Sequence, residues 1–188
     1  MIMKNSAFFS ILLSVLLCCS IWETYAQPYI YEGGDPQWGE IRMNDGSTLS
    51  FAFDYGGTDF DGFSLEEYCS YEEDFVKELK GAEKRFISEF REQWINSSRL
   101  PERNISIKVG PDADYIIKIH PHAFEKNGDF YGDIIVMRAD GAILFRLMQT
   151  YVKGGVLGSF SNLIGDGYES LSQIIVRAFE KGVRRKKI

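Results

Sequence analysis

The chain has 188 residues and a net charge of −6 at pH 7, and 45% of its residues are hydrophobic. This length and apolar content suit one globular domain with a buried core. The acidic balance gives no general attraction for nucleic acid, so we predict no nucleic-acid partner.

The N-terminus has the organisation of a secretory signal peptide. Lys4 lies in a short charged region, an apolar run covers 7–18, and Thr24-Tyr25-Ala26 places small residues at positions −3 and −1 of a cleavage site. The run is shorter than the about 20 residues of a transmembrane helix. We expect cleavage near Ala26 and a periplasmic or extracellular mature protein without a transmembrane segment. An uncleaved anchor and a lipoprotein are the alternatives.

Turn-forming residues divide the remaining chain. Gly33-Gly34-Asp35-Pro36 and Asn44-Asp45-Gly46 mark residues 27–46 as a turn-rich segment, with a short strand expected at 40–43. We expect residues 47–188 to form a single α/β domain. Cys69 is the one cysteine after the expected cleavage site, so no internal disulfide can form, and we expect its thiol to be buried.

Hydrophobic periodicity predicts the first elements of that domain. Apolar residues alternate from Leu49 to Tyr55, which indicates a strand with one buried face. Ser64 and Glu67 fit a capping box, and an apolar stripe that runs to Trp94 indicates one long helix ending near 96–98. Alternation also predicts strands at 105–109 and 115–119.

A hairpin is the clearest element. Asp140-Gly141 lies between two alternating runs and predicts a two-residue turn, which sets the register of the strands. The predicted register pairs Arg138 with Ile143, Val136 with Phe145, Ile134 with Leu147 and Phe130 with Tyr151 on one apolar face. The opposite face contains Met137, Leu144 and Met148 and is more apolar than a solvated face. We expect the N-terminal segment or a partner to cover it.

The C-terminal part begins with a glycine-rich connection at 154–165. We expect this connection to be mobile, with apolar side chains that either dock a partner or tuck onto the core. An apolar stripe from Tyr168 to Phe179 then predicts a final helix. The predicted order is β-α-β-β-β-α. We therefore expect an α+β fold with a largely antiparallel sheet of four to five strands and two helices packed on one face.

The two histidines are the first candidates for chemistry. His120 and His122 are two residues apart in a strand, so their imidazoles share a side and can supply two ligands to zinc or copper. About two more ligands are needed, and Cys69, Glu125 or Asp129 would have to fold nearby. A small metal-dependent or hydrolytic enzyme centred on these histidines is the alternative function.

Other motifs do not complete a known site. Asp59-Phe60-Asp61-Gly62 is similar to the start of a calcium loop but lacks its later ligands. Residues 154–158 precede a helix, as a phosphate-binding loop does, without the Gly-Lys-Ser/Thr that such a loop requires. The chain has neither a nucleophile elbow nor a His-Glu-x-x-His motif. We predict no cofactor.

Several short motifs support a resemblance. They are Phe53-Asp54-Tyr55, Glu66-Glu67-Tyr68, Asp114-Tyr115 and the glycine-rich run from Lys153 to Ser170. On these residues the chain resembles a group of small secreted proteins of unknown function common in Bacteroidetes. Its expected fold is also similar to periplasmic α/β modules of bacterial envelope lipoproteins and curli-secretion channels. The resemblance implies export and supplies no catalytic residue.

We therefore predict an exported, non-catalytic binding or assembly module whose partner is another envelope protein. Two surfaces are candidates for this contact: the glycine-rich loop and the second face of the sheet. The expected binding residues are Val156, Leu157 and Phe160 in the loop, and Met137, Leu144 and Met148 on the sheet.

Overall fold

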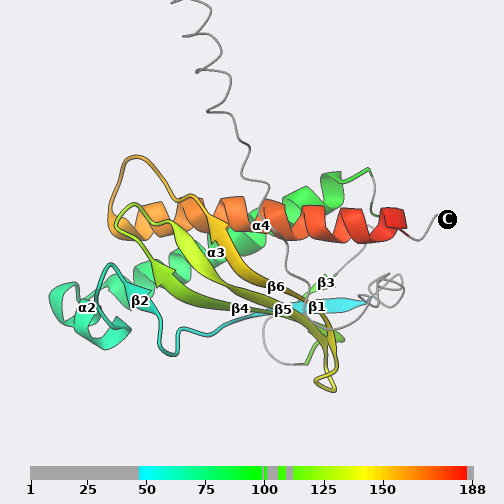
Figure 1. Cartoon of the computed structure of the whole chain (residues 1–188), viewed down its shortest axis with the longest axis horizontal. Coiled ribbons are helices and arrows are strands. Elements are labelled where there is room, and N and C mark those ends of the chain that lie inside the picture. Colours follow the sequence, from blue (N-terminus) through cyan, green and yellow to red (C-terminus); the bar gives the residue numbers. More distant parts are fainter. Residues whose placement is uncertain (1–46, 99, 101–105, 109–111, 186–188) are drawn as a thin grey trace, which may run out of the picture.

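The computed structural model describes residues 47–98, 100, 106–108 and 112–185. The elements in these ranges are β1 (Thr48–Phe53), β2 (Asp59–Phe60), α2 (Leu65–Tyr71), α3 (Phe75–Asn96), β3 (Ser106–Ile107), β4 (Tyr115–Phe124), β5 (Phe130–Arg138), β6 (Ile143–Val152) and α4 (Phe160–Arg185) (Figure 1). The expected signal peptide, the turn-rich segment 27–46 and the strand expected at 40–43 lie outside the described residues.

The strands form one mixed, open sheet. Its order is β3-β1-β4-β5-β6, and β2 pairs with β4 beyond the end of β1. β1 runs parallel to β3 and β4, and β2 runs parallel to β4, whereas β4, β5 and β6 are antiparallel. The α+β class is therefore as predicted. The described residues contain six strands, so the predicted four to five strands and the largely antiparallel character are wrong.

The physical reason lies in the connection between β1 and β4. The 22 residues of α3 carry the chain back along the sheet, so β4 starts at the same end as β1 and runs parallel to it. The additional strand, β2, has two residues, which is too short to show a period in the sequence.

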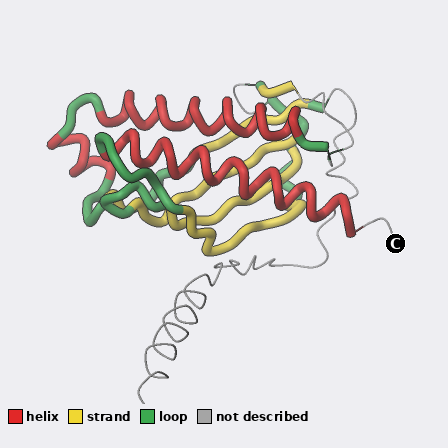
Figure 2. Tube along the Cα trace, turned by 90° about the horizontal axis from the view of Figure 1, so that it is seen from above, coloured by secondary structure: helices red, strands yellow, loops and turns green. Residues whose placement is uncertain are grey.

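Two long helices, α3 and α4, lie side by side across one face of the sheet (Figure 2). Aromatic rings fill the space beneath them. Phe51 of β1 meets Phe86 and Phe90 of α3 edge-on, with centroids 5.2 and 5.0 Å apart. Tyr168 of α4 is fully buried against Phe53, at 5.5 Å. Edge-to-face packing of this kind stabilises beyond the area that it buries.

The region predicted as one long helix contains two. The capping box is confirmed, since the Ser64 hydroxyl accepts from the Glu67 backbone N–H and the Glu67 carboxylate accepts from the Ser64 N–H. The predicted helix end is also confirmed, at Asn96. The break falls at residues 72–74, three consecutive acids. Negative charge disfavours a helix C-terminus and favours an N-terminus, so one helix ends there and the next begins.

The hairpin register is correct in its middle and wrong at its ends. Ile134 pairs with Leu147 and Val136 with Phe145, as predicted. Beyond them the register shifts on both sides, so that Met137 pairs with Ile143 and Phe130 with Val152. The turn itself is longer than predicted. Arg138 N–H donates to the Ala142 carbonyl and Gly141 has φ +85°, which is a three-residue loop with a glycine bulge.

Two further features bear on the predictions. Cys69 lies half-buried on α2 against the core, so its thiol is less buried than expected. Within the described ranges, no helix combines the length and the apolar content that crossing a membrane requires.

Candidate functional site

The predicted histidine pair lies on the sheet face opposite α3 and α4. The rings of His120 and His122 are 5.2 Å apart. His120 Nδ1 lies 3.0 Å from the Asp54 carbonyl oxygen, and His122 Nε2 lies 3.1 Å from the Asp133 carboxylate. Pro121 lies between them inside β4, and its carbonyl faces the β1–β2 connection, where it accepts from the Thr58 hydroxyl. The backbone nitrogen of a strand residue points to the same side as its carbonyl. The N–H that proline lacks would therefore face a loop, so no hydrogen bond between strands is lost.

The structure does not bring the other suggested ligands to these histidines. Asp129 is 5% exposed and accepts from Tyr151, Cys69 lies on α2, and Glu125 lines a separate hollow. In the part of the chain that the structure describes, no three or more His, Cys, Asp or Glu side chains are placed to hold a metal ion. The metal-dependent alternative therefore gains no support.

The carboxylate nearest to His120 is already paired. Lys118 Nζ lies 2.7 Å from Asp54, and this hydrogen bond is the main reason why the pKa of Asp54 is lowered. The suggested calcium motif is a turn, in which the Asp59 carboxylate accepts from the Gly62 N–H.

The second face of the sheet exposes less apolar surface than predicted. Met137 and Met148 are half-buried. Leu144 is only 4% exposed and belongs to the hydrophobic core, so its assignment to an exposed binding face is wrong. The physical reason is the register shift between Val136 and Met137, which removes Leu144 from the position opposite Met137.

The ends of the glycine-rich connection form a joint that is tightly packed against the rest of the chain, and the mobility expected for the connection stays a prediction. A Cβ on Gly154 would lie 2.2 Å from the Asn127 carbonyl oxygen. A Cβ on Gly128 would lie 2.2 Å from the Leu163 backbone, and one on Gly167 would lie 2.7 Å from the Gly128 carbonyl oxygen. Three chain segments therefore cross in backbone-to-backbone contact, which only glycine permits.

Asp129 holds the β6 side of this joint. Its carboxylate accepts from the Gly154 N–H at 2.7 Å and from the Tyr151 hydroxyl at 2.6 Å. Burial alone would raise the pKa of Asp129, but these hydrogen bonds outweigh burial and lower it. The charged carboxylate is thus the form that the folded protein favours.

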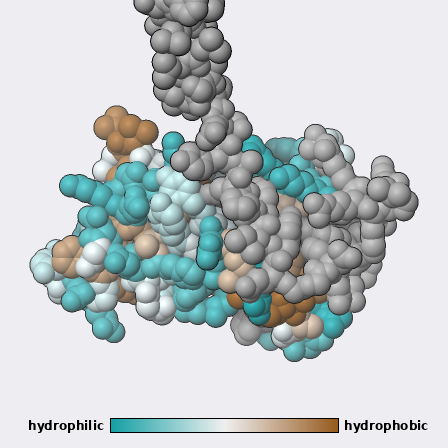
Figure 3. Space-filling view, viewed as in Figure 1, coloured by the Kyte–Doolittle hydropathy of each residue, from teal (hydrophilic) through white to brown (hydrophobic). Residues whose placement is uncertain are grey.

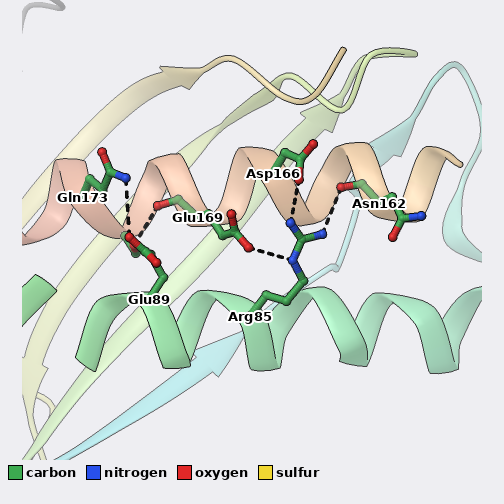
Figure 4. Close-up of polar contacts among 7 residues, drawn as sticks. Arg85, Glu89, Asn162, Asp166, Glu169 and Gln173 are labelled. Atoms are coloured by element: carbon green, nitrogen blue, oxygen red, sulfur yellow. Dashed lines mark hydrogen bonds and ion pairs between the residues drawn. The ribbon is translucent and has the colours of Figure 1, made fainter. Parts of the chain in front are cut away.

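Arg85 of α3 holds the other side, at the start of α4 (Figure 4). Its guanidinium donates to Asp166 at 2.6 Å, to Glu169 at 2.8 Å and to the Asn162 carbonyl at 3.3 Å. Gly165 makes room for it, because a Cβ there would lie 2.2 Å from the guanidinium. The first turns of α4 are therefore fixed to α3.

Between these two anchors, two side chains point into solvent. Val156 is 92% exposed and Leu157 88%, more than any other large hydrophobic residue that the structure describes. Figure 3 shows a brown projection over the β6–α4 connection, the segment that contains both residues. Phe160, predicted with them, is half-buried instead, and its ring lies 5.2 Å from that of Tyr68.

An open hollow lies beside this tip. Its volume is about 510 Å³. The lining residues are Asp61, Glu125, Lys126, Asn127, Val156 and Leu163. We call Val156 and Leu157 together with this hollow the head surface. Two of its side chains are acidic and one is basic, so the apolar tip stands next to net negative charge.

Sequence reasoning missed the residues that hold the tip in place. Arg85 lies on a helix that was assigned only by its apolar stripe, and Asp129 was considered only as a metal ligand. One signal for the joint was available: Asn127-Gly128 is a turn dipeptide between two strands. Nothing local indicates that Gly128 also contacts the start of α4.

A half-buried polar network joins Tyr55, just after β1, to the long helices. The Tyr55 hydroxyl donates to Glu83 at 3.1 Å and shares a 2.9 Å hydrogen bond with the Tyr168 hydroxyl. Burial raises the pKa of all three groups. These residues connect the segment that follows β1 to both long helices.

Glu83→Gln is expected to raise the melting temperature at about pH 7.5 and to leave it nearly unchanged at about pH 4. The pKa of Glu83 is raised in the folded state, so its stabilising contribution is complete below the unfolded pKa and is lost as the pH rises through the folded value. Glutamine keeps the acceptor without the charge. Thermal unfolding of both proteins across this range tests the effect, and a lower melting temperature for the variant at the higher pH would contradict it.

Fold and surface together define an α+β module that presents an apolar tip on a rigid base.

No protein-family model matches the chain, and no similar curated protein was found. Two solved structures of PelC from Paraburkholderia phytofirmans are similar to it. A leucine-to-methionine variant dodecamer is 9% identical and covers 82% of this chain and 96% of its own, with a TM-score of 0.34. A second dodecamer is 10% identical over 74% and 88%, with a TM-score of 0.31. Similarity at this level defines neither fold nor function.

Proposed function

We propose that this protein is an exported, non-catalytic module that docks a partner protein through its head surface. The observation that supports this proposal is the near-complete exposure of Val156 and Leu157 on a loop whose two ends are anchored. Contiguous apolar surface that a protein leaves exposed often marks a binding site. Export rests on the expected cleavage near Ala26.

The tip is suited to binding energetically. Burying Val156 and Leu157 against a partner contributes about 1.5–3 kcal/mol for each side chain. A loop that is already ordered loses little conformational entropy when it binds. The glycine joint and the Arg85 contacts provide that order before any partner arrives.

The surrounding charge favours a protein partner over a lipid surface. Asp61 and Glu125 line the hollow beside the tip. Residues 59–74, which lead from the hollow through α2, contain seven acidic residues and no basic residue. Anionic lipid surfaces attract basic segments and repel acidic ones. A partner that offers an apolar side chain with basic neighbours complements this surface.

The tip is tested by replacing both apolar side chains with serine, V156S/L157S. The protein that has a photo-crosslinking residue in place of Leu157, and is otherwise wild type, is irradiated in an envelope extract. We expect one protein adduct, which excess unlabelled wild-type protein abolishes and excess V156S/L157S leaves in place. Because both side chains are exposed, the free energy of unfolding should change by no more than about 0.5 kcal/mol.

Ile143→Ser is the matched control, because Ile143 is an exposed apolar residue on the distant β5–β6 hairpin. Excess Ile143→Ser should compete as well as wild-type protein. If excess V156S/L157S also abolishes the adduct, or if the crosslinker forms adducts with lipid alone, the proposed contact is wrong.

A further inference from the structure

Charge is distributed unevenly along the molecule. At one end, the segment 59–74 has seven acids and no base. The C-terminal segment 177–187, which begins within α4, has six basic residues and one acid. Figure 1 shows α2 and the C-terminal end of α4 at opposite ends of the long axis. The acidic segment that contains α2 therefore lies at the opposite end of the molecule from the last turns of α4.

The acidic end and the head surface are continuous. Asp61 lines the hollow together with Val156 and precedes α2 by four residues. Tyr68 of α2 contacts Phe160, the first residue of α4, at 5.2 Å. Glu66 and Glu73 are exposed on this end. The apolar tip thus lies at the edge of a broad acidic surface.

The basic end of the same molecule cannot reach this surface. The 26 residues of α4 separate the two, and at 1.5 Å per residue this helix is about 39 Å long. Any contact between the two ends must therefore join different molecules. Their charges are complementary, which both steers association and sets its orientation.

We propose that the basic segment 184–187 of one copy docks on the head surface of a second copy, so that the protein assembles head to tail. This inference rests on the head surface of the proposed function and names its partner as the chain itself. A head-to-tail contact uses two different surfaces, so it leaves one free head and one free tail in a dimer. Further copies add until the assembly closes into a ring or continues as a filament.

The contact should depend strongly on salt. Glu66, Glu73 and Glu125 at the acidic end are exposed, and added salt shortens the Debye length from about 10 Å at 0.1 M to about 3 Å at 1 M. We expect the purified exported protein to sediment as assemblies larger than a monomer at about 0.1 M NaCl and as a monomer at about 1 M NaCl.

Charge reversal tests the pairing directly. The head variant is E66K/E73K/E125K, which spares the capping residue Glu67, and the tail variant is R184E/R185E/K186E/K187E. Each variant alone should sediment as a monomer, because the head variant loses most of the negative charge of its head and the tail variant carries negative charge at both ends. An equimolar mixture should associate again, because the unchanged basic tail of the head variant meets the unchanged acidic head of the tail variant. A nonspecific loss of folding cannot produce that recovery.

The outcomes separate this inference from the proposed function. If wild-type protein is a monomer at low salt, or if the mixture does not assemble, the head-to-tail contact is wrong. If the Leu157 crosslinker then still forms its competable adduct with a different protein, the proposed function stands alone. If wild-type protein does assemble, the Leu157 adduct should contain a second copy of this chain, crosslinked within its basic segment. Binding of the tail to anionic vesicles without self-assembly would also overturn the inference.

Discussion

Gly154→Ala is expected to destabilise the protein by about 3 kcal/mol or more, the upper range for overpacking a close-packed site. The added methyl group would lie 2.2 Å from the Asn127 carbonyl oxygen and 2.4 Å from the Gly128 carbonyl carbon. Both are backbone atoms, so neither can rotate away as a side chain would. The joint must open, and the tip that it carries must move. Urea unfolding of the variant and of wild-type protein measures the loss.

Gly81→Ala is the matched control. Gly81 lies in α3, and no atom is within 4 Å of a Cβ added there. Alanine is the better helix former, so this variant should be more stable by up to about 1 kcal/mol. The same substitution thus has opposite signs at the two sites. Equal unfolding free energies for the two variants would mean that the Gly154 contact does not exist.

Asp129→Ala is expected to destabilise the protein by about 3 kcal/mol at neutral pH, because two hydrogen bonds to a charged acceptor contribute about 1.5 kcal/mol or more each. The substitution removes the acceptor of the Gly154 N–H and one partner of Tyr151. Tyr151→Phe removes only the second of these bonds, so its effect should be about half as large. Similar losses for Asp129→Ala and Tyr151→Phe would show that the Gly154 bond contributes nothing.

The pH dependence gives an independent measure of the same site. The pKa of Asp129 is lowered in the folded state, so its contribution is complete above the unfolded value of about 3.9 and is lost as the pH falls through the folded value. The difference in stability between wild-type protein and Asp129→Ala should therefore shrink below about pH 4. A difference that stays constant well below pH 4, where the folded protein binds the proton, would contradict a charged, hydrogen-bonded Asp129.

Local chemistry accounts for the elements that could be predicted correctly. The capping box at Ser64 and Glu67 and the end of α3 at Asn96 follow from contacts between residues three or four apart. The middle of the hairpin follows from alternation and one turn. The errors at its ends arise because the position of a bulge depends on the elements that the strands pack against. The alternation of apolar residues in the sequence does not contain this information.

The candidate surface was only partly predictable for the same reason. Val156 and Leu157 could be singled out as apolar residues in a glycine-rich loop, but whether they dock or tuck inward stayed open. Phe160, four residues from Val156, packs against Tyr68 on a different helix. Only the neighbours in space distinguish these side chains, because all lie in the same short stretch of sequence.

By itself, the amino-acid sequence determined the local elements, the α+β class, the apolar stripe of α3 and the concentration of acids and bases in separate segments. These depend on side chains that interact over a few residues, or on composition alone. The tertiary structure decided that β1 and β4 are parallel, that Gly128 and Gly154 touch, and that α2 and the C-terminal end of α4 lie at opposite ends. Each of these joins groups far apart in the chain, and such contacts form only when the long helices close over the sheet.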